Sequence, residues 1–175
     1  MHFNRRFLCN LALIASVSLA AMPAHADDAP TPSTLAGGKI ITPEDAKKLI
    51  DAKSALFIDT RSVVNFGKGH LPGAVSAAYK EKSEKVANFD AKIDAFEMEK
   101  LPKNKGAAVV FYSDGPTGWK SYKAAVLSIN AGYKNVMYMR AGTAGWSEKN
   151  YRWSGRRWLN PLPVCSVRPG PCAAG

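Results

Sequence analysis

The stretch AAVVFYSDGPTGW, residues 107–119, decides how this chain folds. Its first six residues form an unbroken apolar run, which is typical of a parallel strand buried on both faces. A turn-forming loop, residues 113–118, follows, and apolar residues then recur at helical spacing from Tyr122 to Ile129 before Gly132. The stretch therefore predicts a strand that enters a helix through a glycine-containing loop.

Similar apolar runs occur on both sides of this stretch. Ala55 to Ile58 and Ala74 to Ala78 precede it, and Val136 to Met139 follows it. Each run is short, and each is separated from the next by turn residues or a helical pattern. Strands and helices that alternate in this way predict an α/β fold, a small doubly wound parallel sheet with helices on both faces.

Three helical patterns complete this arrangement. Thr42-Pro43-Glu44-Asp45 has the features of a helix start: a hydroxyl cap, a proline in the first turn and acids near the positive end of the dipole. Apolar residues at helical spacing, Val86, Phe89, Ile93 and Phe96, predict one or two helices over Ser83 to Lys100, closed by Pro102. Thr143 is predicted to cap a short helix over Ala144 to Lys149.

The first 26 residues have the features of a secretory signal peptide. Arg5 and Arg6 precede an apolar run from Leu8 to Ala21, and Ala24-His25-Ala26 is a small-x-small cleavage site. An uncleaved anchor is the alternative, but the run falls short of the ~20 residues that cross a bilayer. We therefore expect a periplasmic or secreted protein that begins at Asp27 and has no membrane span after cleavage.

Cleavage would leave a basic chain with few possible metal ligands. Because the leader holds two arginines and no acid, the formal net charge would fall from +10 to +8. One histidine, His70, and two cysteines would remain, too few for a His-based zinc or copper site, so we expect no metal and no cofactor.

The positive net charge favours a small oxyanion or an acidic partner protein, and no nucleic acid is expected. A soluble protein that is merely basic is the alternative.

The loop after the central strand is the candidate site. In parallel α/β sheets, ligands bind beyond the carboxyl ends of the strands. Backbone N–H groups and the dipole of the following helix would converge there and favour an anion, with Gly115 and Gly118 allowing the backbone to curl. The predicted anion-binding residues are Ser113, Asp114, Gly115, Thr117, Gly118, Lys120 and Ser121. Alternatively, Asp114-Gly115-Pro116 is only a turn.

Four segments in this order resemble the rhodanese-like domain over residues 40–151. They are Ile58-Asp59-Thr60-Arg61, the segment GHLPGA at 69–74, Val109 to Tyr112, and the segment GTAGW at 142–146. The resemblance implies that a loop cysteine directly after the strand carries a persulfide, which the loop amides stabilise. Ser113 occupies that position here, and Gly118 occupies the position of a second cysteine found in some relatives.

A serine hydroxyl cannot carry a persulfide, so the resemblance implies a pseudoenzyme that retains the anion-binding loop. Asp59 and Arg61 are expected to pair with each other or to cap neighbouring backbone groups, and His70 is expected to hold a turn rather than act as a base. A divergent sulfurtransferase or thiol oxidoreductase that uses Cys165 or Cys172 is the main alternative. A purely structural interaction protein is a third.

The predicted domain organisation has four parts. Residues 1–26 form the signal peptide, 27–38 a flexible leader with little to bury, and 39–151 the rhodanese-like domain. Residues 152–175 form a basic extension, rich in tryptophan and proline, that lies on the domain. Cys165 and Cys172 in this extension are predicted to form a structural disulfide, because an oxidising compartment favours one at this spacing. A redox-active pair is the alternative.

Overall fold

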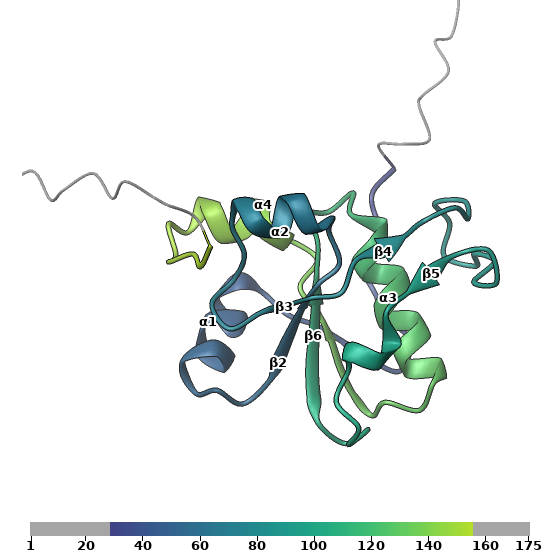
Figure 1. The fold of residues 1–175 in the computed structure, drawn as a ribbon, viewed down its shortest axis with the longest axis horizontal. Helices are drawn as coiled ribbons and strands as arrows, with labels where there is room; N and C mark the ends of the chain where they lie inside the picture. Colours follow the sequence, from purple (N-terminus) through teal and green to yellow (C-terminus); the bar gives the residue numbers. More distant parts are fainter. Residues whose placement is uncertain (1–28, 156–175) are drawn as a thin grey trace, which may run out of the picture.

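A computed structural model describes residues 29–155, which form a five-stranded parallel sheet with helices on both faces (Figure 1). The strand order is β1 (Lys39–Ile40), β7 (Asn135–Tyr138), β6 (Ala108–Tyr112), β2 (Leu56–Asp59) and β3 (Val75–Ser76). Helix α3 (Trp119–Asn130) covers one face, and α1 (Pro43–Asp51) and α4 (Gly142–Glu148) cover the other. This arrangement confirms the predicted fold class.

The central strand β6 contributes to both hydrophobic cores. Val109 and Phe111 pack in the cluster that includes the buried residues of α3. Val110 and Tyr112 point to the opposite face and pack with Ala46 of α1 and Trp146 of α4. Because both faces of β6 are covered, its sequence is apolar throughout rather than alternating.

The two predicted helix starts have different outcomes. The Thr42 hydroxyl caps α1 and accepts a hydrogen bond from Asp45 N at 3.2 Å, and the Asp45 side chain closes a capping box. The prediction that Thr143 caps the last helix is wrong. Helix α4 begins two residues earlier than predicted, at Gly142, and its cap Ala141 makes no side-chain cap bond. The Thr143 hydroxyl instead donates to Asp114 O, at 3.2 Å.

The helical prediction for Ser83 to Lys100 is also wrong. Strands β4 (Tyr79–Lys80) and β5 (Ala95–Phe96) form an antiparallel hairpin, and only a short 3₁₀ turn, η2 (Met98–Lys100), follows. The Asp94 carboxylate accepts hydrogen bonds from Lys82 N, Ser83 N, Ser83 Oγ and Tyr79 Oη at 2.6–2.7 Å. These contacts are incompatible with one continuous helix, in which residues 83 and 94 would lie about 16 Å apart.

A buried lysine of α3 ties this hairpin segment to the core. The Nζ atom of Lys123, which has no exposed side-chain surface, lies 2.8 Å from both Ser83 Oγ and Glu81 Oε1. It also lies 3.9 Å from Asp94 Oδ2 and 5.2 Å from the centre of the Phe89 ring. A buried ammonium needs this many partners to offset its loss of hydration.

The segment before β1 packs on the domain, although the sequence predicted a leader with little to bury. Thr31 and Leu35 are buried. The Thr31 N–H and hydroxyl groups both donate to Pro116 O at 2.8 Å, and Arg140 Nη2 donates to Thr31 O at 2.8 Å. Thr31 therefore lies against the candidate loop at Pro116, whereas Leu35 packs in the core cluster that includes the buried residues of α3. The predicted signal peptide falls outside the described residues.

The described part of the predicted C-terminal extension also lies on the domain. Arg152 O accepts a hydrogen bond from Trp146 Nε1 at 3.0 Å, and Ser154 pairs with His70 in an antiparallel bridge. The rest of the extension, including Cys165 and Cys172, lies outside the described residues. None of the helices between residues 29 and 155 is long and apolar enough to span a bilayer.

The Asp94 network predicts a pH-dependent stability. Burial alone would raise the pKa of the Asp94 carboxyl group, but hydrogen bonds from Ser83, Lys82 and Tyr79 outweigh burial and lower it from 3.8 to about 2. Because the folded-state pKa is lowered, this stabilisation is present above the unfolded-state pKa and is lost as the pH falls towards 2. Replacing Asp94 with Asn should cost about 2 kcal/mol of unfolding free energy at neutral pH.

Denaturant titrations at several pH values would test this. The natural protein should lose more stability than Asp94→Asn between about pH 4 and pH 2. Asp51→Asn, at an exposed carboxylate of α1, is the control and should change stability by less than about 1 kcal/mol. Equal acid sensitivity of the natural protein and Asp94→Asn would contradict the role given to Asp94.

Candidate functional site

The candidate site lies where the loops after β2 and β6 meet. These two strands are neighbours, but the chain leaves β2 towards β3 on one side and leaves β6 towards β7 on the other. Such a change of direction opens a crevice at the carboxyl ends of the strands. An open cleft of about 270 Å³ lies there, between α2 (Val63–Lys68) and α4. Its lining includes Arg61, Asn65, Lys68, Asp114, Ser147 and Trp153.

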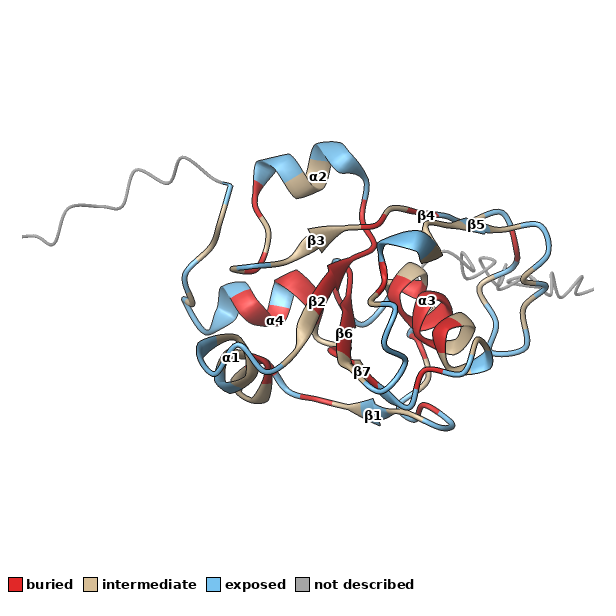
Figure 2. Cartoon of the chain, turned by 60° about the horizontal axis from the view of Figure 1, so that its bottom comes forward, coloured by how far each residue is buried: buried red, intermediate tan, exposed pale blue. Residues whose placement is uncertain are grey.

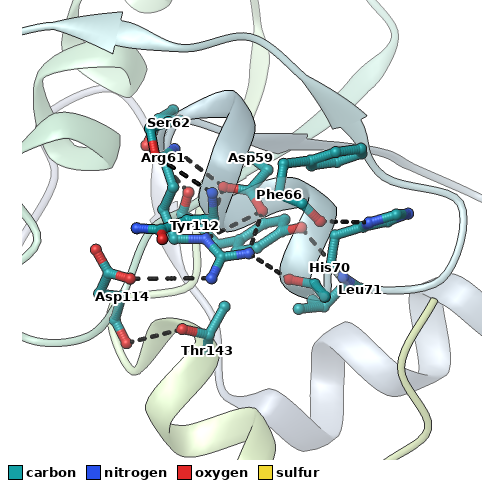
Figure 3. A network of polar contacts seen from close by, with 12 residues as sticks. Asp59, Arg61, Ser62, Phe66, His70, Leu71, Tyr112, Asp114 and Thr143 are labelled. Carbon is teal, nitrogen blue, oxygen red and sulfur yellow. Dashed lines mark hydrogen bonds and ion pairs between the residues drawn. The ribbon is translucent and has the colours of Figure 1, made fainter. Parts of the chain in front are cut away.

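Arg61, which lines this cleft, belongs to a buried ion pair with Asp59 (Figure 3). Arg61 Nη2 lies 2.6 Å from Asp59 Oδ2, and Arg61 Nε lies 3.0 Å from Asp59 Oδ1. The two side chains are 8% and 0% exposed, so the predicted pairing is confirmed. Burial alone would lower the pKa of the Arg61 guanidinium, but the hydrogen bonds and charge of Asp59 outweigh burial and raise it. Arg61 therefore stays charged.

The Arg61 guanidinium also links three segments of the chain. Its Nη2 atom donates to Gly69 O at 2.7 Å, which fixes the turn after α2. Its Nη1 atom lies 3.9 Å from Asp114 Oδ1, in the loop after β6. Asp114 is exposed, so water screens its charge, whereas the guanidinium is buried. The Asp59–Arg61 pair carries no net charge, and the Nη1 side of Arg61, which Asp59 does not bind, provides N–H donors at the cleft.

His70 has the turn-holding role that the sequence predicted. Its Nδ1 atom lies 3.0 Å from Phe66 O, and its ring stacks on the Phe66 ring with 3.8 Å between centroids. Its backbone N–H and C=O pair with Ser154. Nearby, the buried Tyr112 hydroxyl accepts a hydrogen bond from Leu71 N, and burial raises the pKa of Tyr112. These contacts hold the GHLPGA turn against the sheet.

The first turn of α4 fixes the backbone of the loop. Ser113 O accepts a hydrogen bond from Thr143 N at 2.8 Å, and Asp114 O accepts one from Ala144 N at 2.9 Å. This close approach requires Gly142, which has a φ of +56°. A Cβ atom on Gly142 would lie 2.5 Å from Ser113 O and 2.6 Å from Gly115 N. The first glycine of the GTAGW segment is therefore a packing requirement of the loop.

The two loop glycines differ in importance. Gly118 N donates to Gly115 O at 2.8 Å, and a Cβ on Gly118 would lie 2.9 Å from both Cβ and Oγ of Ser113. At Gly115 the φ angle is not left-handed, and a Cβ would make an ordinary contact, 3.5 Å from Ala144 Cβ. The expectation that Gly118 allows the curl is thus confirmed, and the same expectation for Gly115 is wrong.

The predicted anion-binding residues do not all face one volume. Ser113 is buried, and within residues 29–155 its hydroxyl has no hydrogen-bond partner. The backbone N–H groups of Asp114, Gly115 and Thr117 likewise donate no hydrogen bond to the described part of the chain. Ser121 is buried, and its hydroxyl donates to Gly118 O within α3.

Of the predicted anion-binding residues, only Asp114 lines the cleft, and it does so beside Arg61. Lys120, in the first turn of α3, does not. The two tryptophans Trp119 and Trp146 are buried packing residues. The cleft residues Asn65, Lys68 and Trp153 were not predicted, because no sequence motif marks which side chains of α2 and the C-terminal segment face the cleft.

Replacing Gly142 with Ala should disrupt the loop. The added Cβ would lie too close to backbone atoms of the loop, and alanine disfavours the left-handed φ of this position. Both effects oppose folding, so we expect the free energy of unfolding to fall by about 3 kcal/mol. Thermal or denaturant unfolding would measure this loss. Gly67→Ala is the matched control, because a Cβ there meets nothing within 4 Å and a helix favours alanine. An equal effect at the two positions would contradict the packing role of Gly142.

Comparisons with known proteins agree with this geometry. The family model of the rhodanese-like domain matches residues 42–149. The chain is 30% identical over 112 residues to the uncharacterized protein YibN of Escherichia coli K12, covering 64% of this chain and 69% of that protein. It is 26% identical over 115 residues to a tRNA uridine(34) hydroxylase of Photorhabdus laumondii, covering 64% of this chain and 29% of that enzyme.

A solved structure shows the same fold. The BH2092 protein of Bacillus halodurans superposes with a TM-score of 0.51 at 19% identity, covering 67% of this chain and 77% of that one. This similarity concerns the arrangement of the sheet and its helices. Together with the family match over most of the described residues, it leads to one conclusion: the chain belongs to the rhodanese-like domain family.

Proposed function

We propose that this protein is an exported rhodanese-like pseudoenzyme, which binds a small oxyanion or an acidic group of a partner protein and does not transfer sulfur. The observation that carries the proposal is Ser113, which directly follows β6 where the family resemblance expects the nucleophilic cysteine. The sequence contains no cysteine between residues 29 and 155. A hydroxyl neither forms the thiolate that attacks sulfane sulfur nor holds a persulfide.

Export is proposed from the N-terminal sequence alone. A basic region, a short apolar run and the site Ala24-His25-Ala26 occur in the order that signal peptidases cleave. Cleavage after Ala26 would leave only two residues before Ala29, whose carbonyl accepts a hydrogen bond from Trp119 Nε1 at 2.8 Å. The mature chain would thus begin close to the segment that packs on the loop.

Two features support anion binding at the loop. The N–H groups of Asp114, Gly115 and Thr117 lack acceptors within the described chain, and the positive end of the twelve-residue helix α3 lies directly after them. The Arg61 guanidinium is paired with Asp59, but its Nη1 side is not bonded to that carboxylate and offers N–H donors near the loop. The Asp114 carboxylate opposes an anion, but it is 67% exposed and therefore screened by water. These donors do not depend on a thiol.

The protein should show no cyanide-dependent sulfur transfer from thiosulfate, measured as thiocyanate formation. Ser113→Cys should restore some turnover, because it supplies a thiol among the loop donors. Ser54→Cys is the control, because it places a thiol at an exposed position distant in sequence from the 113–118 loop, and it should remain inactive. Turnover by the natural sequence that survives replacement of Cys165 and Cys172 would refute the pseudoenzyme proposal. Turnover lost with those cysteines would support the thiol-enzyme alternative.

Titration with sulfate or thiosulfate should shift the amide NMR signals of Asp114, Gly115 and Thr117. Lys120→Ala should weaken binding only about fivefold, because an exposed ammonium contributes on the order of 1 kcal/mol. Gly118→Val should weaken binding more, since its side chain would fill the space beside Ser113 Oγ. If tens of millimolar anion shift no loop amide, or if Lys120→Ala alone abolishes binding, the loop is only a turn.

A further inference from the structure

The short segment before β1 contacts both the loop and the start of α3. We call residues 29–32, with the sequence Ala-Pro-Thr-Pro, the strap. Trp119 Nε1 donates to Ala29 O at 2.8 Å, and Thr31 N and Oγ1 both donate to Pro116 O at 2.8 Å. Because proline fixes its own φ and restricts the residue before it, the strap has few alternative conformations. The strap is therefore a well-defined neighbour of the loop.

Thr31 is the residue at which the strap is fixed. It is 2% exposed, whereas Ser33 and Thr34 beyond it are exposed. Arg140, which follows β7, donates from Nη2 to Thr31 O at 2.8 Å and from Nε to Thr31 Oγ1 at 3.2 Å. Tyr138 Oη lies 2.9 Å from the same hydroxyl oxygen. The strap is thus attached beside β6 and the first half of α3, which are largely buried (Figure 2).

Three peptide units of the loop have their carbonyl groups held from outside the loop. The first turn of α4 donates to Ser113 O and Asp114 O, and the strap donates to Pro116 O. A trans peptide is planar, so its N–H points away from its C=O, and no peptide bond in residues 29–155 is cis. The N–H groups of these three units belong to Asp114, Gly115 and Thr117, and they are the loop donors without an acceptor in the described chain. Each open N–H is therefore turned away from the group that holds its carbonyl.

The Ser113 side chain lies within the curl of this loop. A Cβ on Gly118 would lie 2.9 Å from both Cβ and Oγ of Ser113, so the two ends of the loop close around that hydroxyl. Ser113 is 2% exposed, and its hydroxyl has no hydrogen-bond partner among residues 29–155. Buried polar groups normally have a partner, so a bound anion or water is expected there.

We propose that Thr31 is a positioning residue of the anion site: by holding Pro116 O, it turns the Thr117 N–H towards the anion, and Arg140 keeps Thr31 in place. This inference rests on the proposed function, because it assigns one of the donors of that site to the strap. Helix α4 orients the other two donors through the backbone. The strap precedes residues 42–149, which match the family model, so this device lies outside the shared domain.

A sulfate titration of the mature protein, followed by backbone amide NMR, tests this role. Thr31→Val keeps the shape of the side chain but removes the hydroxyl that donates to Pro116 O. Sulfate binding should weaken about fivefold, the effect expected for one lost hydrogen bond. The limiting sulfate-induced shift of the Thr117 amide should fall by more than half, whereas those of Asp114 and Gly115 should be kept. Thr34→Val, at an exposed threonine of the same segment, is the matched control and should behave as the natural protein does.

Arg140→Lys separates anchoring of the strap from the effect of charge. Lysine keeps the positive charge but lacks the planar fork that reaches both Thr31 O and Thr31 Oγ1. We therefore expect the same selective loss of the Thr117 shift, with sulfate binding weakened about threefold. An Arg140→Lys variant that binds sulfate as the natural protein does would overturn the anchoring role of Arg140.

The outcomes separate the strap from the anion site itself. If sulfate shifts no loop amide of the natural protein, the proposed anion site fails and the inference fails with it. If the natural protein responds but Thr31→Val keeps the same affinity and the same Thr117 shift, the inference is overturned and the proposed function stands. An equal loss at Asp114, Gly115 and Thr117 would indicate general loosening of the loop and would also overturn a positioning role. Unfolding curves would show that each variant is folded under the conditions of the titration.

Discussion

The buried ion pair between Asp59 and Arg61 organises the end of the sheet. The two-residue spacing lets Asp59 Oδ1 accept hydrogen bonds from both N and Nε of Arg61, while Oδ2 accepts one from Nη2. Buried charges are stable only when such partners offset their lost hydration. The same guanidinium reaches Gly69 O and approaches Asp114. Strand β2, the turn after α2 and the loop after β6 are therefore held by one side chain.

Backbone contacts, rather than a catalytic side chain, fix the geometry of the loop. Thr143 N and Ala144 N hold the carbonyls of Ser113 and Asp114, and Gly142 allows α4 to approach within contact distance. The segment around Thr31 holds Pro116 from the other side. None of these contacts involves the Ser113 side chain. The scaffold of a rhodanese-like site is thus compatible with loss of its thiol, which is why a binding role is the function proposed for it.

The sequence predicted features that depend on neighbours along the chain. The apolar runs became β2, β3, β6 and β7, and the capping box of Thr42 formed as expected. Features set by distant residues were not predictable. The spacing of Val86 and Ile93 resembles that of a helix. However, Asp94 accepts a hydrogen bond from Ser83 N, and Lys123, 40 residues from Ser83, donates to Ser83 O, so contacts with distant residues hold this segment in a non-helical conformation. The need for glycine at 142 rather than 115 likewise depends on a contact between two loops.

We propose that the loop still stabilises a negative charge beside residue 113, although the residue itself bears none. The thiol pKa of Ser113→Cys, obtained from the rate of alkylation as a function of pH, tests this most directly. Residue 113 is buried, and burial alone would raise the pKa of a thiol above its ordinary value of about 8.5. The loop N–H groups that lack an acceptor, together with the positive end of α3, should instead lower the pKa of this thiol below about 7. A pKa at or above about 8.5 would contradict the claim.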